Sequence, residues 1–296
     1  MPIQAIALIL AAAFIHATWN FYVKKVNGGD TFIWITSVIS GLVLIPPTLY
    51  WYSADLPNLS GMQWLFILLS AILHLAYALQ LQRGYAAADF SVVYPLARGS
   101  GPLLTVLAAV IFLGERPSVL GWLGVLGVIA GAMLIGGIDR VIKSSVGAVG
   151  GLQNPRTLLG VKHGLMTGAW IAMYSFADGY AVKVLLVAPL VLDWLTNTIR
   201  ALVLSPIAYR NRSLVMPLLR RAWWPAIVIG ALAPTSYILV LTALKYAPLS
   251  AVAPARELSM MIGAVMGAKL LAEGEFRRRM GGATLIVAGV ACLALG

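Results

Sequence analysis

Charged side chains stand inside otherwise apolar runs of this sequence, where an ionised group is costly. Arg98 shares a helix face with Tyr94, and Arg256 is followed directly by Glu257. A guanidinium stays charged in a membrane, so each arginine needs an anion, a carboxylate partner or water. Two converging arginines suit bidentate binding of a carboxylate, phosphate or phosphonate. The alternative is a structural ion pair with Glu257 or Asp178.

Polar side chains also recur with the four-residue spacing of one helix face. His16 and Asn20 share a face flanked by Trp19, and Tyr174 and Asp178 repeat that spacing later in the chain. Such groups either line a polar cavity or hydrogen bond to neighbouring helices. We predict that they line a cavity and contact a substrate.

Aromatic and titratable residues extend this candidate site. His74 and Tyr77 share a face, and Tyr237 lies in a later apolar run. The tyrosines either clamp a substrate or pack with a satisfied hydroxyl. A proton could serve as coupling ion if a buried group changes protonation during transport. The candidates for that role are His16, His74, Asp178 and Glu257.

Structural roles are expected for other polar residues in or near the apolar runs. Arg200, with Asn197 on the same face, is expected to be buried against neighbouring helices or to reach an interface. Asp193 is expected at the interface. Glu115 and Glu273 are expected to fix loops by pairing locally.

Membrane-spanning helices must position these residues, because the composition excludes a soluble fold. Of the 296 residues, 60% are hydrophobic and 10% charged, with mean hydropathy +0.90, whereas soluble domains are about 25% charged. A bilayer core needs about 20 apolar residues per helix. We predict an all-α integral membrane protein with ten spans near 3–23, 31–52, 61–82, 89–113, 118–138, 159–182, 187–209, 222–244, 249–271 and 277–295.

Internal similarity divides the chain into two halves. Trp, Tyr, Pro and Gly residues coincide at one near-constant offset, as in Trp64 with Trp224 and Tyr77 with Tyr237. We predict a first five-helix repeat over 1–140, a linker over 141–157 and a second repeat over 158–296. An odd number of helices per repeat inverts the second repeat in the membrane.

Basic residues predict the orientation. The net charge is +11, and the basic residues sit in short clusters between apolar runs, which indicates lipid contact rather than nucleic-acid binding. Connections after odd-numbered spans carry most of the Lys and Arg, so these connections are expected in the cytoplasm and both termini outside. The expected location is the cell inner membrane, in a multi-pass arrangement.

Motifs in both halves resemble a known family. Gly84-Tyr85-Ala86, Tyr94-Pro95 and Gly114-Glu115-Arg116, echoed by Lys245-Tyr246-Ala247, Ala253-Pro254 and Ala272-Glu273, resemble EamA-type transporters of the drug/metabolite transporter superfamily. The resemblance implies a ten-helix inverted-repeat carrier with a central cavity, alternating access and frequent proton or exchange coupling. Members usually have both termini in the cytoplasm, opposite to the orientation that the charges predict.

We therefore predict a secondary transporter that exports or exchanges a small polar metabolite, anionic or zwitterionic, such as an amino acid, an organic acid or a phosphonate. Two rivals are an efflux carrier for organic cations or drugs, and a lipid flippase or membrane enzyme. No catalytic motif, cofactor motif or metal-ligand spacing stands out, and the single Cys292 cannot form an intramolecular disulfide. Glycines in spans 118–138 and 277–295 predict close packing within the chain or, alternatively, a homodimer surface.

Overall fold

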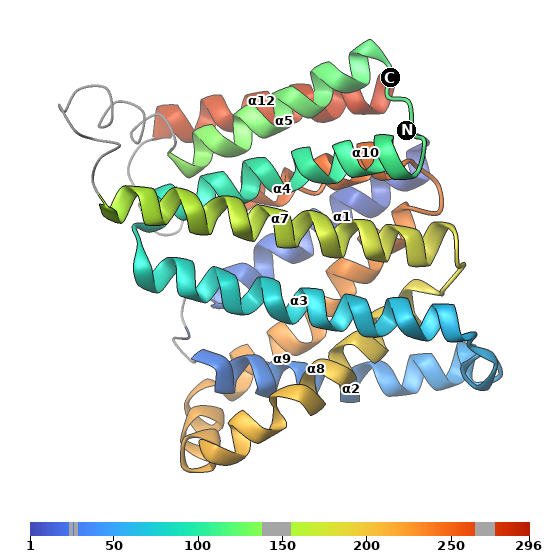
Figure 1. The fold of residues 1–296 in the computed structure, drawn as a ribbon, viewed down its shortest axis with the longest axis vertical. Coiled ribbons are helices and arrows are strands. Elements are labelled where there is room, and N and C mark those ends of the chain that lie inside the picture. The colour runs from blue at the N-terminus through green and yellow to red at the C-terminus, as the bar shows by residue number, and fades with distance from the viewer. Residues whose placement is uncertain (24–25, 27–28, 138–154, 264–275) are drawn as a thin grey trace.

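The computed structural model describes residues 1–23, 26, 29–137, 155–263 and 276–296, and these residues are almost entirely helical. Many of the helices run roughly parallel to one another while others cross them obliquely, and both chain termini lie at the same end of the bundle (Figure 1). The elements in chain order are α1 (Ile3–Val23), α2 (Gly29–Tyr52), the short 3-10 helix η1 (Leu56–Asn58), α3 (Gly61–Ala87), α4 (Phe90–Phe112), α5 (Val119–Gly136), α7 (Pro155–Lys183), α8 (Pro189–Arg210), α9 (Arg212–Ala243), α10 (Leu249–Ala255) and α12 (Phe276–Leu295).

The bounds of these helices agree with most of the predicted spans. Eight of the described helices, namely α1 to α5, α8, α9 and α12, are long and apolar enough to cross a membrane. The helix α7 is more polar, but it is 29 residues long and packs between α3 and α4. An all-α membrane protein is therefore confirmed.

Local sequence signals explain several helix ends. Ser60 forms a capping box with Gln63 at the start of α3, and Ser118 accepts the backbone N–H of Gly121 at the start of α5. Gly137 ends α5 with a φ of 95°, a left-handed conformation that a glycine adopts without steric cost. Pro155 begins α7 inside the predicted linker 141–157, and residues 141–154 of that linker lie outside the described residues.

Two predicted spans differ from the observed helices. The span predicted from residue 222 begins earlier, at Arg212, and Ala222 marks a kink with non-helical φ and ψ of −128° and 28°. The span predicted over 249–271 is wrong as one continuous helix. It breaks at Arg256 and Glu257, where α10 ends, and helix resumes over residues 258–263. The remainder of that span lies outside the described residues.

The glycines of α5 and α12 pack against each other within one chain. A side chain added at Gly124 would lie 2.7 Å from the carbonyl oxygen of Gly289, and one added at Gly131 would lie 2.5 Å from that of Gly282. Such short approaches leave no room for a Cβ atom. These four glycines therefore serve intramolecular packing.

Segments far apart in sequence are tied together at the end of the bundle that carries the termini. Glu115 accepts the backbone N–H groups of Leu249 and Ser250, each at 2.8 Å, and pairs with Lys183 Nζ at 3.2 Å. Burial raises the pKa of the Glu115 carboxyl, but these bonds together with a side-chain bond from Ser250 outweigh burial and lower it below its ordinary value. The predicted local role is thus wrong for Glu115, because its partners are distant in sequence. Glu273 lies outside the described residues.

Candidate substrate site

A cavity of about 770 Å³ lies in the middle of the bundle. Its walls come from α1, α2, α3, α4, α7, α8 and α9, together with residues just after α10. It reaches toward one end of the bundle, where Gly136 closes α5 and Arg278 and Arg279 begin α12. The cluster of Glu115, Lys183, Leu249 and Ser250 at the end that carries the termini does not line the cavity. The described walls therefore extend from the middle of the bundle to the opposite end.

Arg98 forms one wall of the cavity. Its Nη1 atom lies 3.5 Å from Glu257 Oε1, and its guanidinium lies over the Tyr94 ring at 5.7 Å from the ring centroid. The side chain of Glu257 is 1% exposed, and its Oε2 atom has no hydrogen-bond partner among the described residues. Arg98 therefore has a long, one-sided contact with a buried carboxylate and still faces the cavity.

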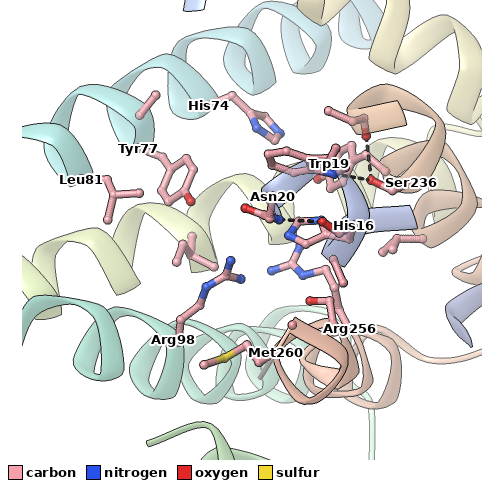
Figure 2. Close-up of a pocket in the computed structure, with 18 of the residues that line it drawn as sticks. His16, Trp19, Asn20, His74, Tyr77, Leu81, Arg98, Ser236, Arg256 and Met260 are labelled. Carbon is pink, nitrogen blue, oxygen red and sulfur yellow. Dashed lines mark hydrogen bonds between the residues drawn. The ribbon is translucent and has the colours of Figure 1, made fainter. Parts of the chain in front are cut away.

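Arg256 approaches the same cavity from the break that follows α10 (Figure 2). The residue is 8% exposed, and its guanidinium lies 5.8 Å from the centroid of the Tyr174 ring. Within the described ranges no carboxylate lies within 4 Å of it. Nearby, His16 also lines the cavity, and its Nε2 atom has no hydrogen-bond partner in the same part of the chain.

Another part of the cavity wall is aromatic. His74 stacks on Tyr174 at a centroid distance of 4.1 Å and meets the ring of Tyr237 edge-on at 5.3 Å, while Tyr77 meets Tyr174 edge-on at 5.5 Å. His74 Nε2 lies 3.0 Å from Asp178 Oδ2, and the Tyr237 hydroxyl donates to the same oxygen atom. Asp178, which is 1% exposed, thus orients two of these rings from behind the wall.

Two further residues of α1 differ in how they are held (Figure 2). Trp19 Nε1 donates to Ser236 Oγ on α9 at 3.2 Å, which links two helices across the cavity wall. Asn20 Nδ2 donates to the backbone oxygen of His16 at 2.8 Å, a bond within its own helix. The carbonyl group of the Asn20 amide is not used by that bond.

The structure brings the predicted site residues together. Ten of them line the cavity: His16, Trp19, Asn20, His74, Tyr77, Tyr94, Arg98, Tyr174, Tyr237 and Arg256. The remaining two, Asp178 and Glu257, do not line it and instead contact residues that do. Whether any of the twelve contacts a substrate stays a prediction.

Three polar residues of α8 were considered from the sequence but were not included in the candidate site. Asp193, Asn197 and Arg200 line the cavity, and Arg200 donates to Ser37 Oγ on α2 at 2.9 Å. The interfacial position predicted for Asp193 is wrong, because this residue is 6% exposed inside the bundle. Asp193 lies four residues before Asn197 and so shares the helix face already assigned to Asn197 and Arg200, and that spacing is a signal that would have added the cluster to the candidate site.

The architecture and this cavity define a class of protein. A bundle of membrane-length helices with polar and charged groups gathered around a central cavity is typical of a membrane transporter. Residues 3–137 match the model of the EamA-like transporter family, and this match is consistent with a membrane transporter of the drug/metabolite transporter type. The resemblance stated from the sequence motifs is confirmed over this range.

Solved structures add a likeness of fold. Twenty-eight chains of solved structures match. One of them, described as "Crystal structure of protein", has a TM-score of 0.73 and 15% sequence identity, and the match covers 98% of this chain and 97% of that one. At that identity the likeness concerns the fold alone. No curated protein matches the chain.

Proposed function

We propose that this protein is a secondary carrier that exports or exchanges a small anionic or zwitterionic metabolite by alternating access. The observation that carries the proposal is the pair Arg98 and Arg256, which reach one cavity from two separate elements. Arg256 has no carboxylate partner in the described part of the chain, so an anion in the cavity would complete its coordination.

The two walls suit the two ends of a zwitterion. Arg98, Arg256 and the unpartnered Nε2 atom of His16 offer donors to a carboxylate or phosphonate group. The rings of Tyr77 and Tyr237, with Asp178 hydrogen-bonded to Tyr237, suit an ammonium group through cation–π attraction and a nearby carboxyl group. A purely anionic substrate would use the first wall alone.

The pairing of helices supports an inverted repeat and hence alternating access. The helix α7 packs on α3, and α1 packs on α9, as expected if the second half repeats the first. Pairs at equivalent positions, α2 with α8 and α5 with α12, also pack together. We propose the repeats 1–140 and 158–296 as the two units that rock around the cavity.

The charge bias supports one orientation. Basic residues gather at the end toward which the cavity extends, including Arg210, Arg212 and Arg277. We propose that this end faces the cytoplasm of a cell inner membrane and that both termini lie outside. The described conformation is then one in which the cavity extends toward the cytoplasm and the Glu115 cluster holds the outer end together.

A rival function also has an observation in its favour. The aromatic wall of Trp19, Tyr77 and Tyr237, backed by Asp178, suits an organic cation. A carrier of that kind would bind cations without either arginine.

A ligand screen separates these functions. Purified wild-type protein is heated with amino acids, organic acids, phosphonates or organic cations, beside the variants Arg98→Ala and Arg256→Ala. Exposed Arg212→Ala serves as the control. A ligand at about 100 times its dissociation constant stabilises the folded state by roughly 2.7 kcal/mol.

We expect anionic or zwitterionic compounds to stabilise the wild type and the control but neither cavity variant. Arg256→Ala is the cleaner variant, because its removal leaves no described carboxylate without a partner. Organic cations that stabilise all four proteins equally would instead establish the rival function.

A further inference from the structure

The cluster on α8 forms a second polar site in the same cavity. Asn197 Nδ2 donates to Asp193 Oδ2 at 3.0 Å, and Arg200 donates to Asn197 Oδ1 and, through Nε, to Ser37 Oγ at 2.9 Å. The chain of bonds thus runs from a carboxylate through an amide to a guanidinium. All three side chains of α8 line the cavity.

Asp193 differs from the other two carboxylates buried in the spans. Asp178 lies 3.0 Å from His74 and Glu257 lies 3.5 Å from Arg98, so each has a basic side chain at one oxygen atom, and neither lines the cavity. Asp193 lines the cavity, and across the described ranges no cation lies within 4 Å of it. A buried carboxylate without a direct counter-ion is the kind that takes up a proton most readily.

We propose that Asp193 is the site at which this carrier binds its coupling proton. The proton adds to a carboxylate oxygen from water in the cavity, which converts the charged group into a neutral acid. It leaves by the same atom when the cavity opens to the other side. This proposal rests on the carrier function proposed above.

The surrounding groups connect this proton to an anionic substrate. The charged groups that act on Asp193 are Arg200 on α8 and Asp178 on α7, and α2 contributes the hydroxyl of Ser37 rather than an ionisable group. The titratable partners of Asp178 come from α3 and α9, and they are His74 and Tyr237.

When Asp193 is ionised, its charge offsets that of Arg200 across Asn197. Protonation leaves the Arg200 charge without that offset, on the wall of a cavity that already holds Arg98 and Arg256. An anion is then held more strongly, so proton binding and anion binding favour each other. The expected coupling is movement of the proton and the anion in the same direction.

Infrared spectroscopy tests the proton site without any substrate. A titration from about pH 4 to about pH 9 covers an aspartate with an ordinary pKa and one raised by burial. The wild type should show the carbonyl band of a protonated carboxylic acid that disappears as the pH rises. Asp193→Asn should lose this band, whereas Asp178→Asn should keep it.

Asp193→Glu provides a second variant in case Asp193→Asn does not fold. It should retain a titrating acid band with a shifted midpoint. An unchanged band in either Asp193 variant would overturn the proposal. That result would leave the carrier function standing, because the ligand screen tests the carrier function separately.

Methanesulfonate tests the coupling, because its charge does not change over this pH range. Its affinity for the wild type should rise as the pH falls, by up to about tenfold for each pH unit when one proton is linked to binding. Asp193→Asn should bind it with a strength that does not depend on pH. Equal pH dependence in the two proteins would overturn the coupling, and no binding to either would count against the anion site itself.

Discussion

Glu115→Gln should destabilise the protein strongly, because one carboxylate ties together three distant segments. It accepts two backbone N–H groups at 2.8 Å and pairs with Lys183 at 3.2 Å. Hydrogen bonds to a charged group contribute roughly 1.5–3 kcal/mol each. Glutamine keeps one acceptor oxygen and turns an amino group toward the other donor. We therefore expect a loss of about 3 kcal/mol in the free energy of unfolding.

The effect should depend on pH in a defined direction. The pKa of Glu115 lies below its ordinary value of 4.5 in the folded protein. The stabilisation by Glu115 is therefore complete at pH values above 4.5, its ordinary pKa. It is lost as the pH falls through the lower pKa that Glu115 has in the folded protein. Reversible unfolding in mixed detergent at neutral pH and at about pH 3 measures the difference between wild type and variant, which should be large at neutral pH and smaller in acid.

Asp55→Asn is the matched control, because Asp55 is an exposed carboxylate in the connection between α2 and α3. It should unfold like the wild type at both values of pH. A Glu115→Gln protein that is as stable as the wild type at neutral pH would refute the reasoning. So would a loss of stability that stays constant down to the acid end of the titration.

Two further predictions concern packing and the aromatic wall. Gly131→Ala should lower the melting temperature clearly, because the added Cβ would lie 2.5 Å from the carbonyl oxygen of Gly282. Gly281→Ala, where the nearest atom to the added Cβ lies at 3.7 Å, should be tolerated. Equal melting temperatures of the two variants would contradict this packing. Tyr237→Phe removes the hydroxyl group that donates to Asp178. In the ligand screen it should weaken the binding of ammonium-bearing ligands more than the binding of simple anions. An equal loss for both classes of ligand would show that the ring has another role.

Most helices could be predicted because the apolar runs and the helix-breaking or charged residues between them indicate the same boundaries along most of the chain. Apolar runs of membrane length, separated by Pro, Gly and clusters of charged residues, predicted most helix ends to within a few residues. The break at Arg256 was not predictable from hydropathy, because apolar residues flank it on both sides. A proline two residues earlier, at Pro254, weakens the helix there, but Pro95 lies inside α4 without breaking it.

The sequence predicted which residues gather around the cavity, but it did not predict which of them face the cavity directly. Four-residue spacing identified the face of His16 and Asn20, and the cost of burying charge singled out Arg98 and Arg256. Sequence spacing cannot tell which polar group faces the cavity and which stands behind the wall, so Glu257 was grouped with the direct contacts. Three-dimensional packing decides that question, and it also places Asp193 in the cavity rather than at the predicted interface.

Flux across vesicle membranes tests the central claim most directly. The protein is reconstituted in lipid vesicles loaded with the best anionic or zwitterionic ligand from the screen, and radiolabelled ligand is added outside. We predict saturable uptake that is stimulated by ligand inside, absent in Arg256→Ala and retained in Arg212→Ala. No uptake of a water-soluble compound, together with a lipid head group found in the cavity of the purified protein, would contradict the account and favour a lipid flippase or membrane enzyme.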